Sequence, residues 1–394
     1  MPGSVIVSGA RTPIGKLAGA FAGFSGMDLG GFAIAAALER AGVKPEDVDY
    51  VFMGHVLQAG QGQITARQAA VKGGIPMSVP ATTVNKVCLS GLNSIYLADL
   101  LIQAGEAEIV VAGGMESMTS APYLLPGARA GYRAGDQKVV DSMMYDGLFC
   151  AFDQVAMGAG TEQYSRAAEI SRERQDELAA ASHEKAAAAI KDGRFADEIV
   201  PVSVPQRRGD PIVIDTDEGV RPETTVESLA KLRPAFDPAG TITPGNASQI
   251  SDGGAALVVM SRAKSESLGI APIGEFVGYG QVAGPDASLL KQPSHAIKNA
   301  LLRAGLALSN VDLFEINEAF AAVGVASIDD LGVSGDIVNV NGGAIARGHP
   351  VGMSGARLAI TVLNELRRRG GGLGAVALCG GGGQGDAALL RTAS

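Results

Sequence analysis

Two cysteines and one histidine occupy positions in this 394-residue sequence where a side chain could take part in chemistry. Cys88 lies in the segment VNKVCLSG, between a β-branched run at 81–87 and an apolar pattern of helical period at 89–104. A thiol at the first turn of a helix faces the positive end of the macrodipole, which favours the nucleophilic thiolate. Because free cysteines often serve only as buried packing, this segment alone leaves both interpretations open.

His349 and Cys379 both lie in glycine-rich segments. His349 is one of four histidines and sits in NGGAIARGHPVGMSG, a segment suited to hold an imidazole in a defined place instead of packing as a helix. The alternative is an ordinary solvent-facing histidine in a turn. Cys379 begins CGGGGQG after the strand-like run AVAL, and four consecutive glycines let backbone N–H groups approach a phosphate or an oxyanion. The cysteine at the head of the run favours the oxyanion.

Polar residues also follow the short apolar segment at 314–316. Asn317 and Glu318 come directly after Ile316, at the end of an expected strand. Open parallel sheets collect their binding sites at the carboxyl ends of strands. Both residues are therefore candidates for the site, although Glu318 could instead cap the helix that follows.

The elements that must position these residues alternate between strand and helix. Apolar runs with strand character and longer segments of helical period follow one another from the beginning of the chain, which predicts a mostly parallel sheet covered by helices. The expected strands include 4–10, 48–54 and 254–260, and the expected helices include 27–41, 63–72 and the long Ser171-capped segment after 171.

An internal repeat indicates that this arrangement occurs twice. ALERAGVKPEDVDYVF at 37–52 aligns with ALLRAGLALSNVDLFE at 300–315, an offset of 263 residues, and CLSG at 88–91 aligns with GMSG at 352–355. Matches in the same order predict two halves of similar fold. The region at roughly 119–247 would be an insertion in the first half, and its long irregular stretch at 121–141 is expected to be a functional loop or an interface.

Composition excludes several other classes of protein. The net charge of −9 and the lack of a long basic run argue against nucleic acid as the main partner. No uncharged apolar run reaches about 18 residues, so no membrane span is expected. Three cysteines predict free thiols in a reducing compartment, which indicates the cytoplasm. The 54 glycines cluster in short runs without a collagen-like period.

Through VNKVCLSG, NEAFA, GGAIARGHPVGMSG and CGGGGQG, in that order, the chain resembles the thiolase family along essentially its whole length. The resemblance implies an α/β fold with a five-layered αβαβα core, made of two duplicated halves, and an inserted loop domain. The implied N-terminal half covers 1–118 plus 248–268, the loop domain for CoA binding and tetramerisation covers 119–247, and the C-terminal half covers 269–394.

The resemblance also implies catalytic roles. Cys88 would be the nucleophile that takes the acyl group, and His349 would deprotonate it. Cys379 would abstract the α-proton of the second acetyl-CoA. Asn317, through a bound water, would join His349 in one oxyanion hole, and the backbone N–H groups of Cys88 and Gly381 would form the other.

Contacts to the substrate follow from the same resemblance. Arg221 is implied at the adenine end of CoA, Ser248 at the pantetheine, and Glu318 as a residue that orients neighbouring polar groups. No permanently bound cofactor and no metal is implied, since CoA thioesters are the substrates. The apolar walls are expected to be Leu148, Met157, Ala319 and Phe320.

The implied activity is the reversible Claisen condensation of two acetyl-CoA to acetoacetyl-CoA and CoA through an acyl-cysteine. The alternative is a degradative thiolase for longer 3-ketoacyl-CoA chains. Ala156 and Leu289 stand where short-chain members often have histidine and methionine, whereas the run at 121–148 resembles the loop that makes such enzymes homotetramers.

Three other classes fit the residues less well. A decarboxylating ketoacyl synthase needs a second histidine beside its cysteine, and Cys379 stands there instead. A nicotinamide-dependent dehydrogenase would carry GxGxxG after its first strand, which this chain lacks. A scaffold or lipid-transfer protein of the same fold would be expected to have lost a reactive residue, yet Cys88, His349 and Asn317 are all retained along with Cys379.

Overall fold

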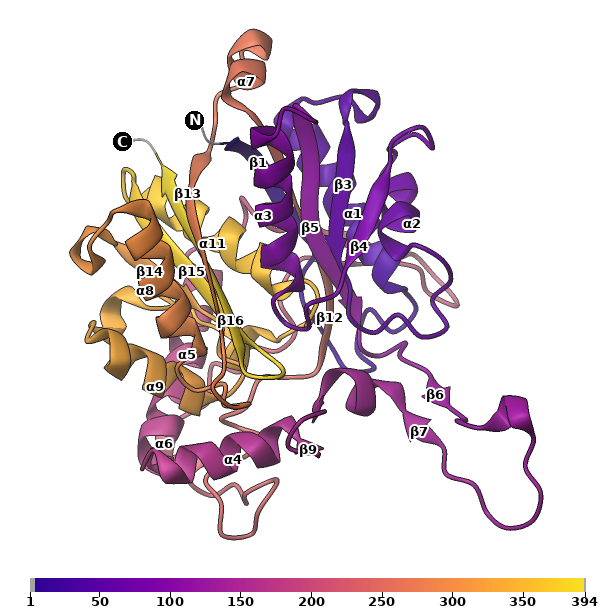
Figure 1. The fold of residues 1–394 in the computed structure, drawn as a ribbon, viewed down its shortest axis with the longest axis vertical. Coiled ribbons are helices and arrows are strands. Elements are labelled where there is room, and N and C mark those ends of the chain that lie inside the picture. The colour runs from indigo at the N-terminus through magenta and orange to yellow at the C-terminus, as the bar shows by residue number, and fades with distance from the viewer. Residues whose placement is uncertain (1–3, 393–394) are drawn as a thin grey trace.

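The computed structural model describes residues 4–392, so the outermost ends of the predicted halves, 1–3 and 393–394, lie outside it. Within the described residues, a continuous ten-stranded sheet forms the centre of the molecule (Figure 1). Its two parts meet where β1 and β13 pair over a short stretch. The first part has the spatial order β4 (Ala81–Val84), β3 (Tyr50–Gly54), β5 (Ile109–Ser117), β12 (Ser251–Ser261) and β1 (Ser4–Arg11), with β2 (Gly15–Lys16) beside β12. The second part continues with β13 (Gly274–Ala283), β16 (Gln384–Thr392), β15 (Gly372–Gly380) and β14 (Leu313–Ile316).

Helices cover both outer faces of the sheets and fill the space between them. Two helices lie between the sheets and pack against both of them in the largest apolar cluster. This cluster joins Leu92 and Ile95 of one helix to Leu358 of the other and to Val376 of a strand. A second cluster holds two helices on the first sheet, and a third holds two helices on the second sheet. The layers are α1 (Gly26–Ala41) and α2 (Thr65–Lys72) outside, α3 (Ser90–Gln103) and α11 (Ser354–Arg368) in the centre, and α8 (Gln292–Ala304) and α9 (Ala321–Leu331) on the far side. The five-layered αβαβα architecture is therefore confirmed.

The predicted internal repeat is visible in the order of the elements. Strand, helix and strand recur with matching neighbours, so that α1, β3, α3 and β5 correspond to α8, β14, α11 and β15. Because α3 and α11 occupy the same layer, the segments that begin them face each other at the junction of the halves. The duplication thus brings Cys88 and the histidine segment into one region.

The expectation of a mostly parallel sheet is wrong. Among residues 4–392, parallel pairing in the large sheet is confined to β3 with β4 and β5, and to β14 with β15. The strands β12 and β16 run antiparallel to both of their neighbours. For β16 the reason is local, because the glycine loop after Cys379 turns the chain back as a tight hairpin instead of a helical crossover.

Part of the region between β5 and β12 lies below the sheets in Figure 1, whereas its helix α5 (Arg172–Lys191) packs against α9 and its segment around Ile199 pairs with Arg11 of β1. The region also holds α4 (Met157–Ala167) and α6 (Val226–Leu229), and Ser171 caps α5 as expected. Its short strands are β6 (Tyr123–Leu124), β7 (Val140–Asp141), β8 (Phe149–Cys150), β9 (Val155–Ala156), β10 (Val202–Val204) and β11 (Ile212–Ile214). The remaining helices are α7 (Arg262–Leu268) and α10 (Ala344–Arg347). The domain boundaries expected from the sequence stay a prediction.

Strands β6 and β7 begin and end an arm that leaves the body of the molecule in Figure 1. Apolar side chains on and beside the arm are exposed, namely Tyr123, Leu125, Tyr132, Val139 and Tyr145. Over residues 4–392, no helix combines the length and the apolar character needed to cross a membrane.

Candidate active site

Cys88 lies in a strained turn between β4 and α3. The preceding residue, Val87, has a φ of 50°, a left-handed conformation that is unfavourable for a β-branched residue. The turn is held by Ser90, whose hydroxyl accepts from the backbone N–H of Lys86 at 2.8 Å and donates to the carbonyl of Val87 at 2.6 Å. The turn therefore fixes the direction in which the thiol points.

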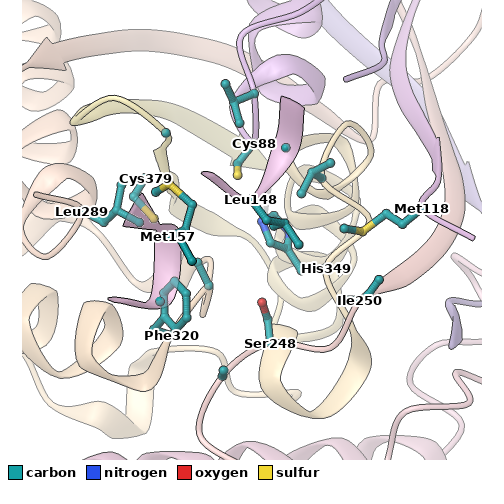
Figure 2. A pocket seen from close by; sticks show the side chains of 18 of the residues that line it. Cys88, Met118, Leu148, Met157, Ser248, Ile250, Leu289, Phe320, His349 and Cys379 are labelled. Atoms are coloured by element: carbon teal, nitrogen blue, oxygen red, sulfur yellow. The ribbon is translucent and has the colours of Figure 1, made fainter. Parts of the chain in front are cut away.

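The two halves supply one cavity of about 210 Å³ with mostly apolar walls. Cys88 reaches it from the first half, and His349 and Cys379 reach it from the second (Figure 2). Cys379 is 1% exposed at the end of β15, and Gly381 lines the same space. The structure thus brings together three reactive side chains that are far apart in the sequence.

Hydrogen bonds assign the tautomer of His349. Its Nδ1 lies 2.6 Å from the hydroxyl oxygen of Ser354, and that hydroxyl donates to the carbonyl of Pro350 at 2.9 Å. Ser354 must therefore accept from an N–H at Nδ1, which leaves Nε2 as an acceptor. Nε2 lies 3.4 Å from Nδ2 of Asn317. The free lone pair is thus on the nitrogen that neighbours Asn317, as a general base requires.

Burial keeps all three reactive groups neutral. It raises the pKa of the Cys88 thiol to about 12, although the N–H groups of Cys88 and Gly381 act on the sulfur in the opposite direction. Burial also raises the pKa of Cys379, and the neighbouring Cys88 raises it further. Burial and, next, the charge of Arg357 lower the pKa of His349 to about 3. The N–H of Cys88 at the helix terminus favours the thiolate, as expected from the sequence, but burial outweighs it.

Asn317 and Glu318 follow β14 and are buried behind the cavity wall. The side-chain oxygen of Asn317 has no hydrogen-bond partner among residues 4–392. Glu318 accepts from the hydroxyl of Ser182 at 2.7 Å, from Nδ2 of Asn339 at 2.8 Å and from the N–H of Ile345 at 3.1 Å. It does not cap α9, whose first turn has no side-chain cap.

Most of the residues expected at the substrate line the cavity. Ser248 is held against the wall because its N–H donates to the carbonyl of Ala319 at 3.0 Å. Arg221 does not line the cavity: it is exposed, and its backbone N–H donates to Nδ1 of His183 at 3.1 Å. The residues that reach the cavity are Ser248, Leu148, Met157, Leu289, Ala319 and Phe320 (Figure 2).

Several contributing residues were not singled out from the sequence. Ser354 sets the histidine tautomer, and Glu116 accepts from the N–H of Gly352 at 3.0 Å in the same segment. Their position inside GMSG and at the end of VVAGGMES was the available signal, but only the folded contacts with His349 and Gly352 give them a purpose. The cavity is also lined by Met118, Met144, Phe236, Ile250 and Val351, and by Ala156, which the sequence had marked as a departure from short-chain members.

Comparisons with known proteins find relatives along the whole length of the chain. The family model described as "Thiolase, N-terminal domain" matches residues 4–263, and "Thiolase, C-terminal domain" matches residues 270–392. A probable acetyl-CoA acetyltransferase of Mycolicibacterium smegmatis is 58% identical over 98% of this chain and 100% of its own. The acetyl-CoA acetyltransferase of Cupriavidus necator is 52% identical over 98% of both.

A solved structure gives the same result for the fold. The crystal structure of the Bacillus anthracis acetyl-CoA acetyltransferase is 39% identical, covers 100% of this chain and 99% of its own, and has a TM-score of 0.97. The match extends over both halves and over the region between them. The chain therefore belongs to the thiolase family.

Proposed function

We propose that this protein is an acyltransferase that condenses two acetyl-CoA to acetoacetyl-CoA and CoA, reversibly, through an acetyl group carried on Cys88. The observation that carries the proposal is the single cavity into which Cys88, His349 and Cys379 all open. Relatives named acetyl-CoA acetyltransferase over the full length of the chain support the choice of substrate.

The first half-reaction is acylation of the thiol. As the sulfur of Cys88 attacks the thioester carbonyl, its proton moves to Nε2 of His349. This nitrogen is available to accept the proton because its hydrogen bond from Asn317 is long, at 3.4 Å. The N–H groups of Cys88 and Gly381 act on the sulfur and are the donors for the carbonyl oxygen. The CoA thiolate leaves and takes the proton of Cys379, which leaves a thiolate there and an imidazolium at His349.

The second half-reaction forms the carbon–carbon bond. The Cys379 thiolate is a strong base because its surroundings are apolar, and it removes an α-proton from the second acetyl-CoA. The protonated His349, with a water bound at the unpartnered oxygen of Asn317, receives the enolate oxygen. The enolate attacks the acetyl-Cys88 carbonyl, and the departing sulfur recovers the proton of His349. Each group ends in its starting protonation state.

The remaining contacts complete the proposal for the site. We assign the pantetheine to Ser248 and the acyl end to the apolar walls, with Arg221 on the loop outside the cavity for the adenine end of CoA. Glu318 orients the segment around Asn339 and Ile345. Coenzyme A thioesters are the ligands of the site, and no permanently bound cofactor enters the mechanism.

We also propose that the protein is a homotetramer in the cytoplasm. The exposed apolar residues on the arm between β6 and β7 support assembly through that arm. Free thiols at Cys88, Cys150 and Cys379 support a reducing compartment. The protein would meet acetyl-CoA and acetoacetyl-CoA there as its small-molecule partners.

The purified protein tests the function through thiolysis of acetoacetyl-CoA by CoA, followed by the loss of the enolate absorbance. Cleavage of acetoacetyl-CoA with a higher kcat/KM than that of 3-ketohexanoyl-CoA is expected. A preference for the longer substrate would instead assign the degradative activity, and no cleavage of either would contradict the proposed function.

A further inference from the structure

A partly buried ion pair joins the segment that carries Cys88 to the strand that follows the glycine loop. The ammonium of Lys86 lies 2.7 Å and 2.8 Å from the two carboxylate oxygens of Asp386. Asp386 is fully buried, and the side chain of Lys86 is 22% exposed. The two residues are 300 positions apart and belong to different halves of the molecule.

The carboxylate is itself fixed from a third side. The hydroxyl of Tyr279 on β13 donates to Asp386 at 2.8 Å, and its ring stacks on Tyr96 of α3 with centroids 4.1 Å apart. Asp386 lies on β16 with the same facing as Ala388 and Leu390, toward the central helix layer. Asp386 is therefore held rigidly in the second half, and the side chain of Lys86 extends to it from the first half.

Both ends of the pair lie close to the proposed oxyanion donors. Lys86 is two residues before Cys88, and Asp386 is five residues after Gly381 in a tight hairpin. The loop also touches the turn directly, since a Cβ added at Gly380 would lie 2.6 Å from Cγ of Leu89. The N–H groups of Cys88 and Gly381 come from different halves, and they can act on one atom only if the halves keep this spacing.

We infer that Lys86 and Asp386 are positioning residues that set the distance between the N–H of Cys88 and the N–H of Gly381. The inference rests on the proposed function, because it gives those two N–H groups a role in the transition state. The backbone N–H of Lys86 also donates to the Ser90 hydroxyl that holds the turn in which Val87 keeps its positive φ. Among the described residues, the Lys86–Asp386 pair is the one ion pair that links the turn holding the nucleophile to the hairpin of the glycine loop.

The double variant Lys86→Met with Asp386→Asn removes the pair without changing the net charge. Loss of one oxyanion donor costs roughly 100- to 1,000-fold in kcat, so displacement of a donor is expected to lower kcat at least about 10-fold. The KM for acetoacetyl-CoA should stay within about twofold, because the pair does not line the cavity. Lys86→Arg should restore most of kcat, and Arg174→Gln, which breaks the exposed pair to Asp329, should leave it unchanged.

Alkylation of Cys88 by iodoacetamide gives a readout that a purely structural role would not move. The two N–H groups favour the thiolate, so their displacement should shift the pH–rate profile of alkylation to higher pH in the double variant. If the double variant does not fold, Lys86→Gln replaces it with the same expectations. A kcat within twofold of wild type, or a loss of kcat with an unmoved alkylation profile, would overturn the inference. Since alkylation needs no turnover, an inactive wild-type protein would contradict the proposed function and still leave this test in place.

Discussion

At the scale of single residues, a half-buried neutral thiol and a buried neutral imidazole face one cavity. A helix terminus stabilises a charge by about 0.3–1 kcal/mol when exposed, which is less than the cost of burying a thiolate in apolar surroundings. Burial therefore decides the protonation of the resting site. It raises the pKa of Cys88 and lowers the pKa of His349, so the thiol keeps its proton and the imidazole stays neutral. In the proposed mechanism, the proton therefore leaves the thiol only as the sulfur attacks.

This resting state predicts how Cys88 reacts with pH. Only the thiolate reacts with iodoacetamide, and a thiol whose pKa lies above the measured range gains about tenfold in thiolate per pH unit between roughly pH 6 and pH 9. The alkylation rate, followed by peptide mass spectrometry of the Cys88 segment, should rise throughout that range. A rate that stays level below neutral pH would instead indicate a preformed thiolate–imidazolium pair.

Cys379→Ser tests the division of labour between the two thiols. A hydroxyl is a much weaker acid and base than a thiol, so proton abstraction from the second acetyl-CoA should suffer most. We expect a burst of CoA release with acetyl-CoA but little sustained acetoacetyl-CoA, measured by rapid quench. Cys150→Ala, at a buried cysteine that does not line the cavity, is the control. Equal losses in the burst and in the steady state would argue against a separate role for Cys379.

The sequence revealed the reactive residues better than their supports. Cys88, His349 and Cys379 stand in glycine-rich or helix-initiating segments whose local pattern is unusual, so each was a candidate from its own segment, and the motifs taken together favoured a catalytic role. Glu116 acts through a contact with Gly352, which is distant in the sequence, and Ser354 acts through a turn that brings its hydroxyl back to His349, which its spacing of five residues does not by itself indicate. The burial of the Cys88 thiol also arises from contacts that form only in the folded chain. For that reason the raised pKa of Cys88 could not be anticipated from the sequence.

At the scale of elements, the beginning of α11 fixes the imidazole. Ser354 is the first residue of that helix, and its hydroxyl connects Nδ1 of His349 to the carbonyl of Pro350. Because α11 is packed between both sheets, the serine cannot move independently of the core. The helix therefore fixes both the tautomer and the position of the His349 imidazole.

Ser354→Ala should release that tautomer. Loss of a buried hydrogen bond of about 1–3 kcal/mol corresponds to roughly a 10- to 100-fold lower kcat, with little change in KM. Steady-state thiolysis measures both, and Ser354→Thr should recover part of kcat. Ser165→Ala, at a buried serine of α4 with an equivalent bond to the carbonyl of Thr161, is the matched control. If both alanine variants lost activity equally, the effect would belong to stability and not to the tautomer.

Periodicity predicted the elements themselves, with ends displaced by a few residues. The helix expected at 27–41 is α1, and that expected at 63–72 is α2. Strand direction was harder, since the run that forms β12 is typical of an apolar strand in either orientation, and β16 was not among the expected strands. Direction depends on the connection, and a glycine loop that could bind an anion also serves as the turn of a hairpin.

At the scale of the whole molecule, duplication explains why the site lies where it does. Each half contributes a helix to the central layer, and the segments that begin these helices carry Cys88 and the histidine. The offset of 263 residues made this symmetry visible in the sequence. The long insertion carries no matching copy, so the arm and the cavity walls from that region had to be inferred from resemblance.

The arm predicts an assembly that depends on apolar contacts. Leu125 and Val139 are 46% and 59% exposed, and burying such side chains would stabilise an interface by roughly 1.5–3 kcal/mol each. Replacing both by serine should convert the tetramer to a smaller species in analytical ultracentrifugation, without changing the circular dichroism spectrum. A variant that stays tetrameric, or a wild-type protein that is monomeric, would contradict assembly through the arm.

The central claim is that one thiol carries the acyl group while the other moves the proton. The most direct measurement is peptide mass spectrometry of the protein mixed with acetyl-CoA and quenched in acid. We expect an acetyl group on Cys88 and none on Cys379 or Cys150, and we expect Cys88→Ala to keep its fold but to show neither the acetyl group nor turnover. An acetyl group on Cys379, or a Cys88→Ala variant that still condenses acetyl-CoA, would contradict the account.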